Sequence, residues 1–164
     1  TGTSGQVLTS GGTGVAPTFQ TAAGGGKVLQ VVQYTSSSSY NTTSTSYQQA
    51  HQTGTFTLNN SSNKILVIAN FHSVASSSGG AGGYVALYRG SVASGTRITS
   101  GNEPMNYDNS VASSMYTITM MQYLDTPGAN TTYSIGHRRH NNATNHIVQG
   151  STFQTVITMM EIEV

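Results

Sequence analysis

The stretch KILVIANFHSVASSSGGAGGYVALYRG, residues 64–90, decides the fold of this chain. It opens with an apolar run at residues 65–69, in which positions of both parities are hydrophobic. A strand with this pattern has both faces covered, so it belongs in the middle of a packed structure. After a Ser/Gly loop at residues 76–83, the aromatic and β-branched segment 84–89 predicts a second strand. Because one antiparallel pair is only marginally stable, further strands must pack on it.

Uncharged polar residues take the place of charged ones in the composition. Charged residues make up 7% of the 164 residues, and the formal net charge is +1, whereas charged residues make up roughly 25% of a typical globular protein. The nine Tyr and the low net charge argue against an intrinsically disordered chain. The absence of Cys excludes disulfides, thiolate catalysis and Cys-based zinc sites.

The composition predicts neither nucleic-acid binding nor membrane insertion. The six Lys and Arg residues are scattered over the chain, so no basic patch for nucleic acid is expected. No apolar run approaches the ~20 residues that cross a bilayer. The chain begins at Thr1 without a basic segment followed by an apolar one, so we interpret it as a fragment or processed product without a secretory signal.

Residues 1–26 form a separate compositional block that ends in three glycines. Its few apolar residues, which include Val7, Leu8 and Phe19, are too sparse to bury a core. One interpretation is a flexible leader. The other is a short extended stalk segment, in which identical chains supply the missing partners of these three anchor residues. We therefore divide the chain into a fibre-stalk or linker segment at 1–26 and a head domain at 27–164.

Short runs of alternating or β-branched residues predict a series of strands in the head domain. No segment shows the apolar recurrence of a helix over ten or more positions. About eight strands separated by Gly, Asn and Ser turns predict an all-β fold, an antiparallel jelly-roll β-sandwich. Besides the pair within 64–90, the expected strands are 27–34, 55–58, 115–124, 131–140 and 152–164, with short edge strands at 44–49 and 96–99.

The last expected strand carries its apolar and acidic residues on opposite parities. Because side chains alternate along a strand, one parity faces the core and the other faces solvent. We expect the even-numbered set to point inward and the two carboxylates, Glu161 and Glu163, to point outward. The even-numbered set consists of Val156, Met160, Ile162 and Val164.

The acidic residues do not form a convincing catalytic pair. Glu103 and Asp108 share one loop and are the only two carboxylates close enough to consider, while Asp125 lies in a predicted turn. Loop solvation is the simpler interpretation, since nothing else in the loop suggests the acid and base of a glycosidase. Neither a Gly-x-Ser-x-Gly elbow nor a phosphate-binding glycine motif is present. We predict no enzyme activity, no catalytic residue and no cofactor.

The densest cluster of functional residue types is His137-Arg138-Arg139-His140, followed by His146. On a strand His137 and His140 have opposite parity, so they bind one metal only if the strand bends. Three copies of one His around a threefold axis are an alternative, but we predict no metal site. Arg138 and Arg139 could bind an anionic or polar surface ligand, or the segment could be a solvated strand end. Tyr side chains stack on sugars, and Asn, Ser and Thr bond to them, so this surface also suits glycans. The expected ligand or receptor contacts are Arg138, Arg139, His137, Tyr107 and Asn142.

The opening GTSGQVLTSGGTGVAPTFQ resembles a short module of tail-fibre and related virion proteins of bacteriophages. The matching positions are Gly2, Gly5, Gln6, Val7, Leu8, Ser10, Gly14, Pro17 and Phe19, although Trp is commoner than Phe at the last one. The remainder resembles the C-terminal domains of marine phage structural proteins. Their inferred fold is similar to the jelly roll of tumour necrosis factor and complement heads, which assembles as a trimer.

The resemblance implies a phage virion structural protein in the tail fibre or on the capsid surface. As a distal fibre head it would form a homotrimer, join other virion proteins through its N-terminal segment and attach to a host-surface glycan or protein. Trimerisation would cover the second face of residues 65–71. Attachment would map to loops remote from the N-terminal segment, at residues 76–83, 101–109 and 141–149. The alternatives are a capsid decoration (cement) protein with the same fold and a lectin-like glycan-binding module.

Overall fold

The computed structural model describes residues 1–22, 27–76, 81–99, 105–108, 114–149 and 153–164. Every regular element in these ranges is a β-strand, which confirms the all-β prediction for the part of the chain described. None of these residues belongs to a helix long and apolar enough to cross a membrane. The strands are β1 (Gln6–Thr9), β2 (Thr18–Thr21), β3 (Val28–Ser36), β4 (Tyr40–Thr42), β5 (Gln48–Gln52), β6 (Lys64–Ser76), β7 (Ala81–Arg89), β8 (Thr96–Arg97), β9 (Met105–Asp108), β10 (Ser114–Asp125), β11 (Tyr133–Arg139), β12 (Asn145–Gln149) and β13 (Thr155–Ile162).

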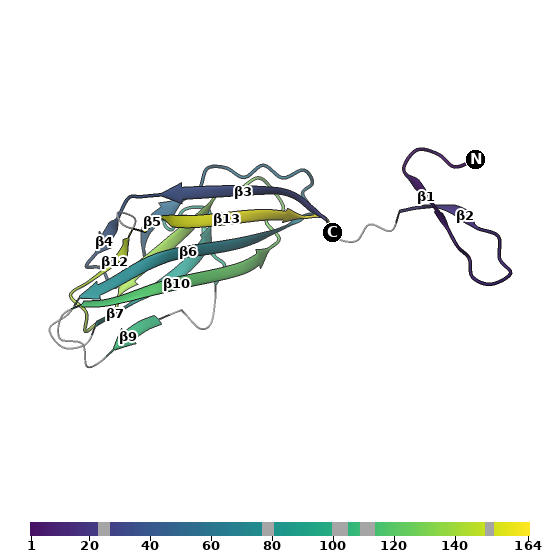
Figure 1. The fold of residues 1–164 in the computed structure, drawn as a ribbon. Helices are drawn as coiled ribbons and strands as arrows, with labels where there is room; N and C mark the ends of the chain where they lie inside the picture. The colour runs from purple at the N-terminus through teal and green to yellow at the C-terminus, as the bar shows by residue number, and fades with distance from the viewer. Residues whose placement is uncertain (23–26, 77–80, 100–104, 109–113, 150–152) are drawn as a thin grey trace.

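Two antiparallel sheets form a sandwich, and β6 is the centre of the first (Figure 1). Strand β10 pairs along one edge of β6, from Ser114 opposite Ser76 to Asp125 opposite Ile65. The other edge of β6 pairs first with β13 and then with β12, and β3 and β4 lie outside these two strands. The second sheet has the order β5-β11-β7, with β8 and β9 both on the far edge of β7. In the first sheet, strands from the two halves of the chain alternate.

The inner face of β6 builds the core. Ile65, Val67, Ala69 and Phe71 are buried and pack in one cluster with side chains of the second sheet, such as Leu87. The opposite face of β6 is covered less completely, because Leu66 and Ile68 are only half-buried. Within a single chain, therefore, one of the two apolar faces of β6 stays partly open.

The inward face of β13 is the reverse of the predicted one. The odd-numbered residues, from Thr155 through Ile157 and Met159 to Glu161, are buried, whereas Met160 and Ile162 are half-buried. The prediction placed the even-numbered residues in the core because they are the more apolar set. That parity lies on the outer face of the sheet, where Met160 is opposite Leu66 of β6 and Val31 of β3.

Glu161 is fully buried, and this was unexpected for a carboxylate. Its two oxygens accept hydrogen bonds from the Asn59 amide N–H at 2.8 Å and from side-chain amides of Gln30, Asn59 and Asn63, each at 2.7 Å. Buried charges need hydrogen bonds of this kind. The turn at residues 59–63 is thus folded around the carboxylate.

Other segments differ from the sequence-based expectation in extent. Residues 55–58 form no strand, only one bridge between Phe56 and Thr131. Of the edge strand expected at 44–49, only residues 48 and 49 belong to a strand, β5, because residues 43–47 form a loop between β4 and β5. The loop expected at 141–149 contains β12.

Asp125 is buried and accepts two hydrogen bonds from the Arg89 guanidinium, at 2.6 and 2.8 Å, and one from the Tyr133 hydroxyl at 2.8 Å. Glu103 lies outside the described residues.

The N-terminal segment is a hairpin rather than an extended chain. Strands β1 and β2 pair from Gln6 opposite Thr21 to Thr9 opposite Thr18, and they pair with no described strand of the sandwich. Gly12 and Gly14 in the connection have positive φ angles of 102° and 80°, which favour glycine. The predicted anchors Val7, Leu8 and Phe19 are 48–61% exposed. Their missing partners are therefore not supplied by the hairpin itself.

Candidate functional site

The strand registers place the predicted attachment loops at one end of the sandwich. Ser76 is opposite both Ser114 and Asn145, and Ala81 is opposite Asp108. The opposite end holds the pair of Ile162 with Val28. The described parts of the three predicted loops therefore lie remote from the start of β3, at the end of the sandwich away from the C-terminus (Figure 1). Residues 77–80, 101–104 and 109 of these loops lie outside the described residues.

Three predicted contact residues belong to one cluster at this end. Arg138 is opposite Tyr84 on the neighbouring strand, and its guanidinium carbon lies 3.7 Å from the centre of that ring. This distance is typical of a cation–π interaction. The rings of Tyr84 and His140 are 5.8 Å apart, and those of His140 and Tyr107 are 4.4 Å apart. Asn142 completes the series by donating a long hydrogen bond of 3.4 Å to the Tyr107 hydroxyl.

We call these five residues, Tyr84, Arg138, His140, Tyr107 and Asn142, the tyrosine–arginine cluster. The sequence pattern identified Arg138, Tyr107 and Asn142 but not their connection. Tyr84 and His140 lie between Arg138 and Tyr107 and connect them. The pairing of β7 with β11, which places Tyr84 opposite Arg138, could not be read from the sequence. The cluster is a partly exposed polar and aromatic surface of the kind that contacts ligands or partner proteins.

Arg139 faces away from this cluster and ties two loops together. Its Nε donates to the carbonyl oxygen of Thr43 at 2.6 Å. Its Nη1 donates to the carbonyl oxygens of His140, Asn141 and Ala143, at 2.8–3.1 Å. These donors are occupied by the protein's own backbone, so the structure places Arg139 as a loop support.

His137 is buried, contrary to the expectation of a surface contact. It is 1% exposed, and its Nδ1 lies 3.3 Å from Nδ1 of His146 on the other sheet. Burial, with the proximity of His146 and His51, lowers the pKa of His137 to about 3. Burial also lowers the pKa values of His51 and His146 to about 4. All three imidazoles are therefore neutral at neutral pH.

The prediction that the side chains of His137 and His140 point in opposite directions agrees with the structure. His137 points into the sandwich, whereas His140 contacts the outer rings of Tyr84 and Tyr107. Within the described ranges, no three His, Asp or Glu side chains are grouped so that they could hold a metal ion.

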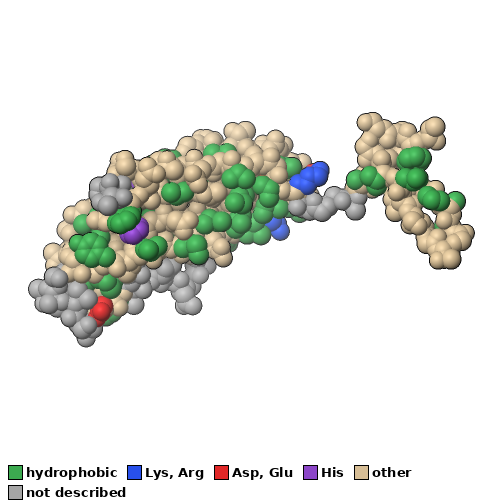
Figure 2. Space-filling view, in the orientation of Figure 1, with side chains coloured by type: hydrophobic (Ala, Val, Ile, Leu, Met, Phe, Trp, Pro, Cys, Tyr) green, Lys and Arg blue, Asp and Glu red, His purple; other side chains and the backbone are tan. Residues whose placement is uncertain are grey.

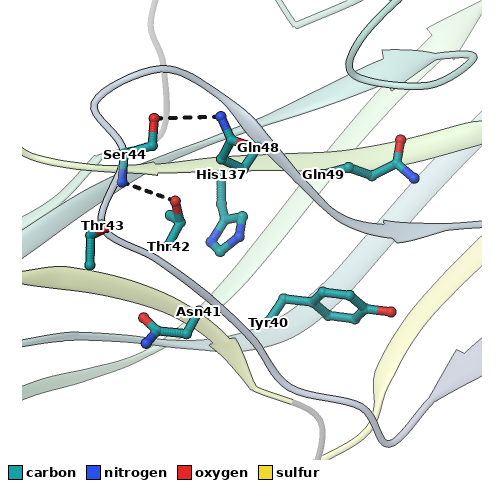
Figure 3. Close-up of a pocket in the computed structure, with 8 residues that line it drawn as sticks. All are labelled: Tyr40, Asn41, Thr42, Thr43, Ser44, Gln48, Gln49 and His137. Atoms are coloured by element: carbon teal, nitrogen blue, oxygen red, sulfur yellow. Dashed lines mark hydrogen bonds between the residues drawn. The ribbon is translucent and has the colours of Figure 1, made fainter.

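A pocket of about 610 Å³ opens beside the buried histidines, between β4 and the start of β5. Figure 3 shows the imidazole of His137 between the segment that carries Tyr40 and Thr42 and the start of β5. The other lining residues are Asn41, Thr43, Ser44, Gln48 and Gln49. A second pocket of about 520 Å³ shares Gln48 and Gln49 with it and is otherwise lined by Tyr47, Ser91, Val92 and Ala93. Sequence reasoning missed both pockets because they form only where β4, β5 and β11 meet the loops at residues 43–47 and 91–93.

The outer face of the β3-β13-β6-β10 sheet carries many apolar side chains, with polar side chains such as Asn70, His72 and Gln122 between them. Tyr116, Ile118 and Met120 on β10 are 70%, 77% and 65% exposed. Leu124 on the same strand is opposite Leu66 of β6, which is in turn opposite Met160 of β13. Figure 2 shows hydrophobic side chains gathered over this sheet near the C-terminus of the chain, with smaller separate groups elsewhere on the same face. We call this surface the apolar face; its residues are Val31, Leu66, Ile68, Tyr116, Ile118, Met120, Leu124, Val156, Met160 and Ile162.

Comparisons with known proteins add little to this description. No protein-family model matches the chain, and no curated protein matches it. Among solved structures, the chain is similar to one described as "Structure of infectious bursal disease virus Gx strain", with 11% sequence identity and a TM-score of 0.23. The match covers 97% of this chain and 45% of that chain, so this chain spans less than half of it. A likeness of this size carries no argument about function.

Proposed function

We propose that this chain is a phage virion structural protein whose jelly-roll domain forms a homotrimeric head and attaches to the host surface. The observation that carries the proposal is the apolar face. Tyr116, Ile118 and Met120 lie on one strand and are 65–77% exposed, and grouped exposed apolar side chains of this size commonly mark protein–protein contacts. Covering Tyr116, Ile118 and Met120 alone would contribute about 4–6 kcal/mol per chain.

The number of copies and the setting come from the sequence rather than from the geometry. The N-terminal motif resembles phage fibre modules, and the head resembles a jelly roll that assembles as a trimer. The exposed anchors Val7, Leu8 and Phe19 supply a second apolar contact between copies or with other virion proteins.

The tyrosine–arginine cluster supports the attachment role. It lies at the end of the sandwich remote from Val28, and therefore remote from the start of the domain. In a head carried by its N-terminal segment, this end faces the host. A capsid decoration protein would use the same trimer with the hairpin laid on the shell, and labelling of the chain on intact particles separates these two locations.

Light scattering of the purified chain at micromolar concentration tests the association. We expect a particle of about three times the 17.1 kDa chain mass. Ile118→Asp should produce monomers, because a carboxylate cannot be buried without a partner. Thr96→Asp on the exposed strand β8 of the other sheet is the matched control and should stay trimeric. A wild-type monomer, or an Ile118→Asp trimer, would contradict the proposed use of the apolar face.

Attachment is tested separately, with the assembled chain as a competitor of phage adsorption to host cells. We expect adsorption to fall as the concentration of the chain rises, because both bind the same surface receptor. A trimer that neither binds host cells nor competes with phage would contradict the attachment role and leave the trimer intact.

A further inference from the structure

The first of the two adjoining pockets beside β5 has a wall fixed by hydrogen bonds. The Ser44 amide donates to Thr42 Oγ1 at 3.0 Å, and the Ser46 amide donates to Ser44 Oγ at 3.0 Å. From β11, Arg139 binds this wall through its backbone amide, which donates to the Ser44 carbonyl oxygen at 3.0 Å, and through its guanidinium, which donates to the Thr43 carbonyl oxygen. Hydrogen bonds inside the loop and hydrogen bonds from Arg139 of β11 therefore both fix residues 43–46. A wall fixed in this way needs little ordering when a ligand binds.

The lining of the first pocket is polar but uncharged. The described residues that line it carry hydroxyl and amide groups, and its His137 is neutral because burial lowers its pKa. The nearby guanidinium of Arg139 bonds to backbone carbonyls, and that of Arg138 lies over the Tyr84 ring. A charged ligand would find no opposite charge among these lining side chains, whereas a neutral ligand rich in hydroxyl groups would find donors and acceptors.

Two side chains at the mouth have unused hydrogen-bonding groups. Among the described residues, the amide of Asn41 and the hydroxyl of Thr43 have no hydrogen-bond partner, and both side chains are exposed. On the opposite face of β4, the Tyr40 side chain lines the same pocket and is 39% exposed (Figure 3). A pocket lined by free amide and hydroxyl groups and by an aromatic side chain matches an oligosaccharide, whose units offer both hydroxyl groups and apolar ring faces.

The size of the site indicates more than one sugar unit. Pockets for small ligands commonly measure roughly 300–1,000 Å³, and both pockets, at about 610 and 520 Å³, fall in this range. Because Gln48 and Gln49 line both, the two hollows meet at the start of β5. The Gln49 amide is fixed by bonds with Val92 and Gln52, whereas Gln48 is held only by bonds of 3.4 Å to residues 44 and 46.

We propose that these two pockets bind a neutral oligosaccharide, with Asn41 and Thr43 bonding to its hydroxyl groups, Tyr40 packing against it from the other face of β4 and Gln48 reaching between the two subsites. This inference rests on the proposed attachment function and names the chemical class of its receptor. It also gives Arg139 an indirect role, since Arg139 supports the 43–46 wall rather than contacting the ligand.

Binding of the full chain to an array of neutral, sialylated and sulfated oligosaccharides tests the proposal. We expect retention of neutral glycans of two or more units, followed by titration of the best of them. Asn41→Ala and Gln48→Ala should each weaken the affinity about tenfold or more, with unchanged circular dichroism. Gln154→Ala removes an exposed amide outside the pockets and should leave the affinity unchanged.

Three results would overturn the proposal: no binding to any glycan on the array, binding of acidic glycans only, or neutral-glycan binding unaffected by both pocket variants. Adsorption to host cells separates this failure from failure of the attachment role. If the pocket variants compete with phage adsorption as well as the wild type does, the oligosaccharide site is wrong and attachment stands. If the wild-type chain binds neutral glycans but not host cells, the site stands and the attachment role is wrong.

Discussion

The substitution Glu161→Gln tests the buried carboxylate that holds the turn at residues 59–63. Glutamine has almost the same shape, but it replaces one acceptor oxygen by an amide that only donates. If the glutamine oxygen takes the place of Oε1, it keeps the bonds from the Asn59 backbone and Asn63, while the side-chain amides of Gln30 and Asn59 then face another donor. Hydrogen bonds to charged groups contribute about 1.5–3 kcal/mol each, so losing two should lower the free energy of unfolding by about 3–6 kcal/mol.

Urea unfolding measures this loss as a lower midpoint at unchanged slope. Wild type and variant must be compared at one protein concentration, because association adds to apparent stability. The control is Glu163→Gln, whose carboxylate pairs with Lys27 at 3.4 Å between two exposed side chains. Such pairs contribute about 1 kcal/mol or less. A loss below about 1 kcal/mol for Glu161→Gln, or one equal to the control, would refute the reasoning from these hydrogen bonds.

The pH dependence of the same variant adds a second readout. Burial opposes ionisation of Glu161, but hydrogen bonds from Asn63, Gln30 and Asn59 outweigh it and lower the carboxyl pKa from 4.5 to about 2. A carboxyl group with a lowered folded-state pKa stabilises the fold above its unfolded pKa, and the stabilisation is lost as the pH falls from about 4.5 to about 2. The wild type should therefore lose stability in this window, and Glu161→Gln should lose less.

Two further predictions concern the buried histidines. His51, His137 and His146 have folded pKa values of about 3–4 against 6.5 unfolded, so the unfolded chain binds protons first and stability should fall below pH 6.5. Each contributes at most about 1.4 kcal/mol per pH unit, and equal urea midpoints at pH 7 and pH 5 would contradict the prediction. Gly83→Ala should destabilise the sandwich strongly, since the new Cβ would overlap the His146 ring, whereas Gly54→Ala meets no atom within 4 Å. Equal melting temperatures for these two variants would show that the β7–β12 contact can relax.

The fold class was predictable because the apolar runs are short and bounded by turn residues. The central position of β6 followed from its two apolar parities, and the half-buried character of β10 followed from its alternation. The inward face of β13 was not predictable by the same rule. Its open face is the more apolar one, and its buried face ends in a carboxylate whose partners lie about 100 residues earlier in the chain.

The candidate site was predictable only in part, for a similar reason. Residue types identified Arg138, Tyr107 and Asn142, but parity alone could not tell that His137 points to the core and that Arg139 holds a loop. The pockets depend on the register of β5 against β11, which is shifted by a bulge between Ile135 and Gly136. A Ser/Thr/Gln-rich segment lacks the apolar alternation that would indicate a strand register or a bulge, so the pocket walls could not be placed from the sequence.

The apolar face spans β3, β13, β6 and β10, whereas the proposed oligosaccharide site lies between β4 and β5, at the edges of the two sheets, and this separation decides whether both proposals can hold at once. Association through the outer face of β3, β13, β6 and β10 leaves the outer face of the β5-β11-β7 sheet in solvent. Of the pocket-lining segments, only the short strand β4 belongs to the first sheet, where it pairs with β12 away from the exposed residues of β10. A trimer would thus present three sites, and a receptor surface carrying many sugars would be held by all of them together. Ile118→Asp should then reduce binding to a dense glycan surface far more than binding to the free oligosaccharide, and an equal reduction would show that the two surfaces are not independent.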